Sequence, residues 1–347
     1  MVEQTGTALA QIPTDTPEPT GTPTRRVTVT LTPTPTKIPD TPTPTPTPWA
    51  LESFSTRLYP GAAPVQYIND TCAYLENKWG TDKADPGTVV VPIMFHSILE
   101  PGKQATKAED ITTDYFEYFM DYAKQLGFST ITTTELVEFL KGNQVIPRHS
   151  MILILDDRRP DTPGLFMPYL EANDWTLTLA WPTTADTSEA LWAKMEAYVE
   201  TGRVEVQSHG HNHAYIQSYT PQDVVEEEIY RPIEVIESHF SAAPKALIWP
   251  GGNFTQESVI MAADAGFELG FTVYSRGPIM YNWIPLGEPE QAVDNPLMVL
   301  PRAWSSAADV ALIKALEISE AAAEQAAEVR GQEQLYFDLF CTPAEGD

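Results

Sequence analysis

Basic residues are scarce in this chain of 347 residues, in which 21 Lys and Arg stand against 48 Asp and Glu, a formal net charge of −27 at pH 7. A protein this acidic is repelled by nucleic acid and by anionic membrane surfaces, so we expect no nucleic-acid partner. A solvated acidic surface explains the charge, and a cationic glycan as partner would fit the same sign. With 42% hydrophobic residues, the chain can still form one large core or two small ones.

Long apolar runs, internal repeats and the glycine fingerprint of dinucleotide-binding sheets are also missing. No run is long enough to span a bilayer, so the sequence predicts no transmembrane segment. The first residues, MVEQTGTALAQIP, lack the basic-then-apolar pattern of a signal peptide. We therefore expect that a leader peptide was either removed from this sequence or never present.

Cysteine is limited to Cys72 and Cys341, which lie near the two ends of the expected folded domain. Because domain termini are often close in space, an oxidising compartment would let the two thiols pair and close a very long loop. The alternative is a pair of unrelated buried thiols. The spacing favours the disulfide without excluding that alternative.

Residues 1–50 are of low complexity and contain the alternating stretch TLTPTPTKIPDTPTPTPTP. Proline removes backbone donors and fixes φ, so such a run cannot bury apolar surface. We predict a disordered, extended Thr/Pro-rich stalk or linker over 1–50, a lead-in segment over 51–87 and a folded barrel over 88–347. Stalks of this kind hold a domain away from a membrane or wall, which favours an extracellular or surface-tethered location; a nonspecific tail is the alternative.

From residue 88 on, apolar strands alternate with segments of helical spacing. This alternation predicts parallel βα units, and seven or so of them in about 260 residues suit a barrel better than an open sheet. We expect strands at 88–96, 129–132, 150–157, 176–181, 204–208, 245–250, 268–273 and 297–301. We expect helices at 114–128, 134–141, 188–200, 221–240, 256–265 and 307–329.

Charged and imidazole side chains gather where these strands end. Asp156 and Asp157 close one strand, and three of the six histidines, His209, His211 and His213, directly follow another. Adjacent carboxylates at a buried strand end are costly unless a cation offsets them, and histidines at i and i+4 can share one ion. Two imidazoles plus one carboxylate are typical of a catalytic zinc or related divalent metal, with the second carboxylate free as a base. The alternatives are a helix-capping Asp pair and histidines that only bond the backbone.

With these motifs the chain resembles the polysaccharide deacetylases, carbohydrate esterase family 4. The family's motifs occur here in the family's order as MFH (94–96), ILDDR (154–158), HGHNH (209–213), WPGG (249–252) and LPR (300–302). The family's first, second and third motifs correspond to ILDDR, HGHNH and WPGG. The WPGG and LPR motifs are similar to the branch that acts on poly-N-acetylglucosamine. The match covers roughly 88–305, and the joint occurrence is more specific than any single motif.

The resemblance implies a distorted (β/α)7 barrel and a bound divalent metal, usually zinc. Carried over by position, Asp157, His209 and His213 would be the metal ligands and Asp156 the general base. The implied reaction is hydrolysis of the N-acetyl groups of an N-acetylglucosamine-containing polysaccharide, releasing acetate. A metal would lower the pKa of its bound water and polarise the acetyl carbonyl, and Asp156 would take the water proton.

The sequence departs from the family around the aspartate pair and in the second motif. Ile154 replaces a hydroxyl residue and Arg158 replaces a glycine, while Gly210 replaces a small hydroxyl residue that orders the second motif. Arg158 could pair with Asp156 and lower its pKa, reach a substrate group, or point to solvent. The arginine that many members carry before the third motif's proline, where it orients the base, is also absent.

The proton donor is not apparent, because no histidine follows His239, where most members carry a late Leu-x-His motif. His96 or His211 could substitute. We take His96, Trp249 and Arg302 as candidate substrate contacts, although Trp249 could pack under its loop and Arg302 could orient a carboxylate. Tyr215 and Tyr219 are weaker candidates for lining a groove.

Three functions fit these observations. The first is a metal-dependent carbohydrate N-deacetylase, and the second is a catalytically weak or inactive glycan-binding protein on the same fold. The third is a metal-dependent amidase on another N-acyl substrate. The polymer, the metal and the oligomeric state cannot be predicted from the sequence.

Overall fold

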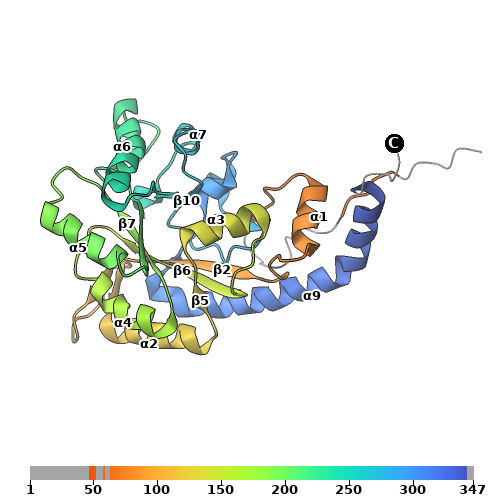
Figure 1. The fold of residues 1–347 in the computed structure, drawn as a ribbon, viewed down its shortest axis with the longest axis horizontal. Coiled ribbons are helices and arrows are strands. Elements are labelled where there is room, and N and C mark those ends of the chain that lie inside the picture. The colour runs from red at the N-terminus through yellow and green to blue at the C-terminus, as the bar shows by residue number, and fades with distance from the viewer. Residues whose placement is uncertain (1–46, 52–57, 59–62, 342–347) are drawn as a thin grey trace, which may run out of the picture. The chain divides into compact units, whose positions relative to one another are not determined.

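The computed structural model describes residues 47–51, 58 and 63–341 (Figure 1). The predicted stalk therefore lies outside the described residues except for 47–50, and the predicted domain bounds stay a prediction. Within the described part of the chain, no helix is both long and apolar enough to cross a membrane.

A curled parallel sheet forms the centre of the fold. In the described residues its strands follow the spatial order β10-β9-β8-β7-β6-β2-β12, and β5 pairs with the start of β6. The strands are β2 (Val89–Phe95), β5 (Ser129–Thr130), β6 (His149–Asp156), β7 (Leu177–Trp181), β8 (Val204–Ser208), β9 (Ala246–Ile248), β10 (Leu269–Phe271) and β12 (Ala303–Trp304). Strands β2 and β6 are apolar on both faces, as parallel strands covered on both sides must be.

The two edges of this sheet meet through the segment before β12. Leu300 donates its N–H to the Gly270 carbonyl at 2.7 Å and accepts from the Thr272 N–H at 2.9 Å. Three residues after Leu300, Ala303 begins the strand β12, and Ala303 and Trp304 pair in parallel with β2 at the other edge. The sheet therefore closes almost on itself, and the predicted distorted (β/α)7 barrel is confirmed.

Helices cover the sheet and follow its strands in the chain (Figure 1). They are α1 (Thr71–Trp79), α2 (Thr113–Gln125), α3 (Thr133–Gly142), α4 (Pro163–Asn173), α5 (Glu189–Val199), α6 (Gln222–Phe240), α7 (Gln256–Asp264), α8 (Glu288–Gln291) and α9 (Ala308–Phe340). The smaller strands are β1 (Ala63–Val65), β3 (Ser97–Leu99), β4 (Asp110–Thr112) and β11 (Ile284–Leu286). Helix α3 begins at a capping box, in which Thr132 and Glu135 each bond the other's backbone N–H.

Side chains of each strand alternate between two apolar clusters, one on each face of the sheet. In β6, Met151, Leu153 and Leu155 pack with α2, α4 and α9 on one face. Ile152 and Ile154 belong to the other cluster, with α3, α6 and α7. Because direction alternates along a strand, Asp156 follows Ile154 onto this second face and is buried there.

Two sequence-based assignments need correction. The expected strand 297–301 is instead a short 3-10 helix, Pro296–Val299. The Trp249 indole donates to the Met298 carbonyl at 2.7 Å, and a Cβ on Gly270 would lie 2.0 Å from that oxygen. Within this segment only Leu300 pairs with β10, through an isolated parallel bridge to Phe271, so no continuous strand forms. Helix α4 is missing from the predictions, and Pro168 lies inside it, at a position where proline normally ends a helix.

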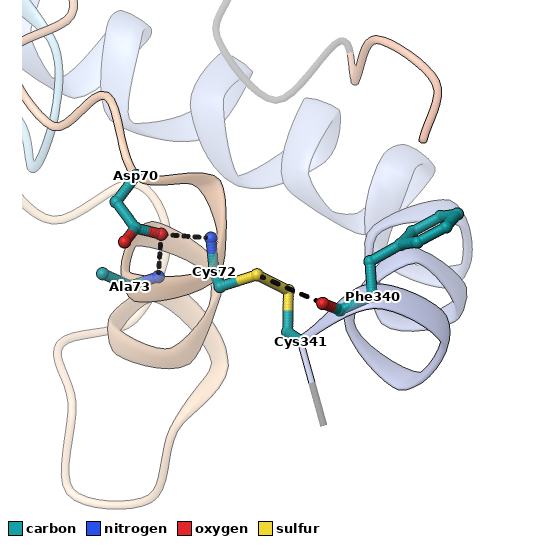
Figure 2. Close-up of a disulfide and its surroundings, with 5 residues drawn as sticks. All are labelled: Asp70, Cys72, Ala73, Phe340 and Cys341. Atoms are coloured by element: carbon teal, nitrogen blue, oxygen red, sulfur yellow. Dashed lines mark hydrogen bonds between the residues drawn. A yellow bond between two sulfur atoms is a disulfide. The ribbon is translucent and has the colours of Figure 1, made fainter. Parts of the chain in front are cut away.

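The lead-in segment packs against the end of α9, which extends beyond the predicted helix 307–329. A disulfide joins Cys72, in the first turn of α1, to Cys341 at the end of α9, so the predicted pairing is confirmed (Figure 2). Asp70 caps α1 by accepting from the N–H groups of Cys72 and Ala73. Further along, the buried Glu333 accepts from Lys78 at 2.7 Å, so a covalent bond and an ion pair hold the same two helices.

We expect that replacing both cysteines by serine lowers the free energy of unfolding by about 2–4 kcal/mol. The bridge spans a sequence separation of 269 residues, and its loss frees that loop in the unfolded chain. Urea unfolding measures the change. Reducing the wild-type protein should reproduce it, reductant should not affect the double variant, and equal stability of the oxidised wild type and the variant would contradict the prediction.

Candidate active site

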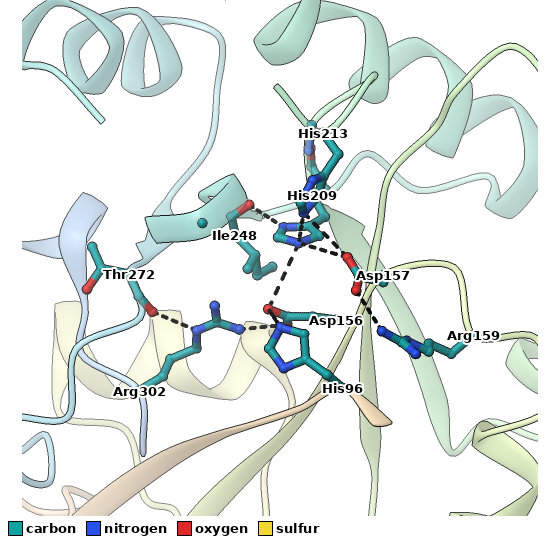
Figure 3. A network of polar contacts seen from close by, with 12 residues as sticks. His96, Asp156, Asp157, Arg159, His209, His213, Ile248, Thr272 and Arg302 are labelled. Carbon is teal, nitrogen blue, oxygen red and sulfur yellow. Dashed lines mark hydrogen bonds and ion pairs between the residues drawn. The ribbon is translucent and has the colours of Figure 1, made fainter. Parts of the chain in front are cut away.

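The predicted site residues lie on loops that meet at one end of the barrel (Figure 3). Asp156 ends β6 and Asp157 follows it, His209 directly follows β8, and His96 directly follows β2. Arg302 directly precedes β12. Because the carboxyl ends of parallel strands share one edge of a sheet, loops far apart in the chain converge here.

Asp157, His209 and His213 place one donor atom each around a common point. The Asp157 Oδ1 atom is 3.4 Å from His213 Nε2 and 3.8 Å from His209 Nε2, and the two imidazole nitrogens are 3.1 Å apart. Donors that share one ion at about 2.0–2.2 Å from each are separated by distances of this size. Among the residues that the structure describes, these three form the cluster that could hold a metal ion. Their donor atoms and spacing suit a divalent ion.

The protonation of His209 also suits metal binding. Its Nδ1 atom lies 2.8 Å from the Ile248 carbonyl oxygen, which can only accept, so Nδ1 carries the hydrogen. The lone pair is therefore on Nε2, the atom that faces Asp157 and His213. Burial lowers the pKa of His209 to about 4, which keeps the imidazole neutral at pH 7.

Backbone geometry at the two other donors is unusual. Asp157 has φ of 70° and His213 has φ of 59°, in the left-handed region that most side chains disfavour. Asp and His tolerate this region better than branched residues do. Such backbone at two of three converging donors is typical of functional sites held in place by their surroundings.

Arg159, which the sequence analysis overlooked, contacts the second oxygen of Asp157. Its Nη2 atom is 3.1 Å from Asp157 Oδ2, and its Nη1 atom donates to Ser97 Oγ at 3.0 Å. One Asp157 oxygen is thus oriented by the guanidinium and the other faces the imidazoles. Arg158, which stands where the family has a glycine, forms an ion pair with Asp186 at 2.8 Å and none with Asp156.

Asp156 is a separate, buried carboxylate beside the three donors. Its Oδ1 atom accepts from Arg302 Nη1 at 2.6 Å, and its Oδ2 atom is 3.5 Å from His96 Nε2 and 3.9 Å from His209 Nε2. Burial alone would raise the pKa of Asp156, but the Arg302 guanidinium and the two imidazoles outweigh burial and hold that pKa below its usual value. Asp156 is therefore ionised and oriented at neutral pH.

Comparison with known proteins agrees with this geometry. Residues 143–270, which span β6 to β10 and carry Asp156, Asp157 and the three histidines of the second motif, match the family model of the polysaccharide deacetylases. The predicted resemblance to this family is confirmed. No curated protein sequence matches the chain significantly.

Solved deacetylase structures share the fold. The Streptococcus pyogenes deacetylase PplD, solved in complex with acetate, superposes with a TM-score of 0.55 at 19% identity, over 67% of this chain and 99% of that one. IcaB from Ammonifex degensii gives 0.51 at 16% identity, over 69% and 100% of the two chains. A de-N-acetylase from Aggregatibacter actinomycetemcomitans gives 0.51 at 14% identity, over 62% and 94%.

Two of the predicted substrate contacts are buried in the structure. Trp249 is fully buried and its indole bonds the Met298 carbonyl, so the ring packs beneath the loop, as in the alternative considered for it. Arg302 is also buried, and it donates to Asp156 and to the Thr272 carbonyl at 2.7 Å. The prediction of sugar contact is thus corrected for both, and Arg302 acts as the partner of the carboxylate.

The two histidines considered as proton donors face different parts of the structure. His96 is 17% exposed, faces Asp156 and stacks on Trp304 with ring centroids 5.9 Å apart. His211 points the other way, with Nδ1 2.9 Å from Thr183 Oγ1. Beside the donors, Tyr215 is 53% exposed, and the centroid of its ring lies 5.7 Å from that of the His213 ring.

Proposed function

We propose that this protein is a metal-dependent hydrolase that removes N-acetyl groups from an N-acetylglucosamine-containing polysaccharide and releases acetate. One observation carries the proposal: three donors fit a single divalent ion directly beside a second, ionised carboxylate. Three protein ligands leave a coordination position open, as in catalytic rather than structural zinc sites. The family match supports the N-deacetylase chemistry.

Asp156 is the proposed general base. A zinc or related divalent ion held by Asp157, His209 and His213 would polarise the acetyl carbonyl. It would also lower the pKa of water, so that loss of a proton to a base makes the water a nucleophile. Asp156 is ionised because Arg302 outweighs its burial, so it can accept the proton of that water. Arg302 occupies Oδ1 and leaves Oδ2 facing the donor cluster, which directs the free oxygen toward the reacting atoms.

His96 is the proposed proton donor for the leaving amine. Its Nε2 atom is 3.5 Å from Asp156 Oδ2, so a proton taken by the base could be passed on across the site. The stacked Trp304 ring restricts the orientation of the imidazole. Partial exposure leaves it accessible to a substrate atom.

The substrate and location follow from weaker observations. The exposed Tyr215 ring beside His213 suits stacking on a sugar face. Among chitin, peptidoglycan and β-1,6-linked poly-N-acetylglucosamine, the WPGG and LPR motifs favour the last. The Cys72–Cys341 disulfide and the Thr/Pro-rich N-terminal sequence support a secreted or surface-tethered protein.

Acetate release from N-acetylglucosamine oligomers tests the proposal. We expect release by the purified protein, loss of release after treatment with a chelator, and recovery on adding zinc. Glycan binding without metal or acetate would favour the inactive glycan-binding protein. Stoichiometric metal binding with no acetate from any glycan would favour an amidase on another N-acyl substrate.

A further inference from the structure

Both imidazole donors lie on one short loop, 209–213, so their separation depends on what holds that loop. A side chain from α6 fills the inside of the turn. The Glu228 carboxylate accepts from the His211 N–H through Oε2 at 3.0 Å and from the Asn212 N–H through Oε1 at 2.7 Å. Both N–H groups lie between the two ligands, so one carboxylate holds the middle of the turn.

Glu228 is buried, although its neighbours Glu226 and Glu227 are exposed. It shares the core-facing side of α6 with Val225, Ile229 and Pro232. A carboxylate on that side is costly unless its oxygens are bonded, and burial raises the pKa of Glu228 while the backbone N–H groups of the loop oppose the rise. These bonds to the loop account for an acidic residue in an apolar stripe.

Gly210 makes room for this carboxylate. Its φ is 75°, a conformation that side chains disfavour. A Cβ at this position would lie 2.2 Å from Glu228 Oε2 and 3.2 Å from Pro250 Cγ. Gly210, which replaces a hydroxyl residue in the second motif, therefore leaves the space that the Glu228 side chain of α6 occupies.

We infer that Glu228 is a positioning residue that fixes the spacing of His209 and His213, and that Gly210 is the residue that admits it. The inference rests on the proposed function only in taking the two imidazoles as metal ligands. The bonding of the loop itself does not depend on the reaction.

The first experiment compares Glu228→Gln with Glu226→Gln. Glutamine keeps the shape of the side chain but turns one acceptor into a donor, which leaves one loop N–H without a partner. Glu226 lies on the same helix and is exposed, so it is a matched control. In the metal-free protein, we expect the His211 and Asn212 amides to exchange with solvent roughly tenfold faster in Glu228→Gln, with β6 amides and the control unchanged.

Zinc affinity gives a second readout. Loss of a residue that orients metal ligands typically weakens binding by about 10- to 100-fold, and we expect that decrease in Glu228→Gln only. Unchanged exchange at both loop amides in a folded Glu228→Gln protein would overturn the inference, as would unchanged zinc affinity where the wild type binds zinc. If the wild type neither binds zinc nor releases acetate, the proposed function fails, and the exchange measurement still decides the role of Glu228.

The second experiment tests the fit between the two residues with a double-mutant cycle. Gly210→Ala should accelerate exchange of the loop amides strongly in the wild type, because its methyl group meets Glu228 Oε2. In a Glu228→Ala background the same substitution adds only the strain of a positive φ and the close contact with Pro250. Its additional effect on the exchange rate of the loop amides should therefore be several-fold smaller. Equal effects in the two backgrounds would show that Gly210 is not there to admit Glu228.

Discussion

Replacing Asp156 by asparagine is expected to lower kcat for acetate release by about 100- to 10,000-fold, the range that a general base contributes. Asparagine keeps the size of the side chain but cannot take up a proton. In the structure, Asp156 Oδ2 is the carboxylate oxygen that remains free of Arg302 and faces the donor cluster. We therefore expect the loss in kcat with little change in KM.

Zinc binding distinguishes this effect from loss of the metal site. Asp156→Asn should bind zinc nearly as tightly as the wild type, because the predicted ligand is Asp157. Asp157→Asn is the matched comparison at the next position, and it should lose both zinc and activity. Activity of a folded, zinc-loaded Asp156→Asn protein within tenfold of the wild type would remove Asp156 from the mechanism.

The site could be predicted where its residues follow strand ends. The apolar runs of β6 and β8 are strong local signals, and the residues that follow them are Asp157 and His209. Parallel strands then bring these positions to one edge of the barrel without further information. The structure brings the three predicted donors together, and their role as metal ligands stays a prediction.

The residues that orient the site could not be predicted in the same way. Arg302 reaches Asp156 across a sequence separation of 146 residues, and only the closing of the barrel brings them together. The sequence left two roles open for Arg302, contact with the substrate and orientation of a carboxylate, and the structure shows the second. Which carboxylate it orients could not be predicted from the sequence. Glu228 did leave a signal, an acidic residue in the apolar stripe of α6, that can be read only once the helix face is known.

Trp249 illustrates a different limit. A tryptophan next to a glycine-rich loop at a strand end predicts a sugar platform as readily as a packing residue. Its burial depends on the 3-10 segment Pro296–Val299, whose apolar sequence suggests a strand. The contact between Trp249 and Met298 therefore involves two segments whose local patterns were both ambiguous.

Replacing Arg302 by methionine is expected to lower the free energy of unfolding by about 3–5 kcal/mol at neutral pH, the cost of leaving a buried charge without its partner. Both members of this pair are almost fully buried, so solvent does not screen their interaction. Arg231→Met is a suitable control, because Arg231 and Glu234 are exposed and such pairs contribute about 0–1 kcal/mol. Urea unfolding with a chelator present excludes a contribution from bound metal.

The pH dependence of this loss has a definite sign. In the wild type the pKa of Asp156 lies below its usual value, so its contribution to stability is present above the unfolded pKa of about 3.9 and is lost only as pH falls through the folded pKa. Without Arg302, burial raises the pKa of Asp156, and the ionised form then destabilises the folded state. The difference between variant and wild type should therefore shrink as pH falls from about 7 to about 5.

The double variant Asp156→Asn, Arg302→Met separates the charge from the packing. It removes the unpaired carboxylate together with the guanidinium, so it should recover much of the stability that Arg302→Met loses, and its stability difference from the wild type should lose the pH dependence. A pH-independent loss in Arg302→Met of the same size as in the double variant would mean that Arg302 stabilises the barrel by packing alone. In that case the ionised state of Asp156, on which the proposed base depends, would need another cause.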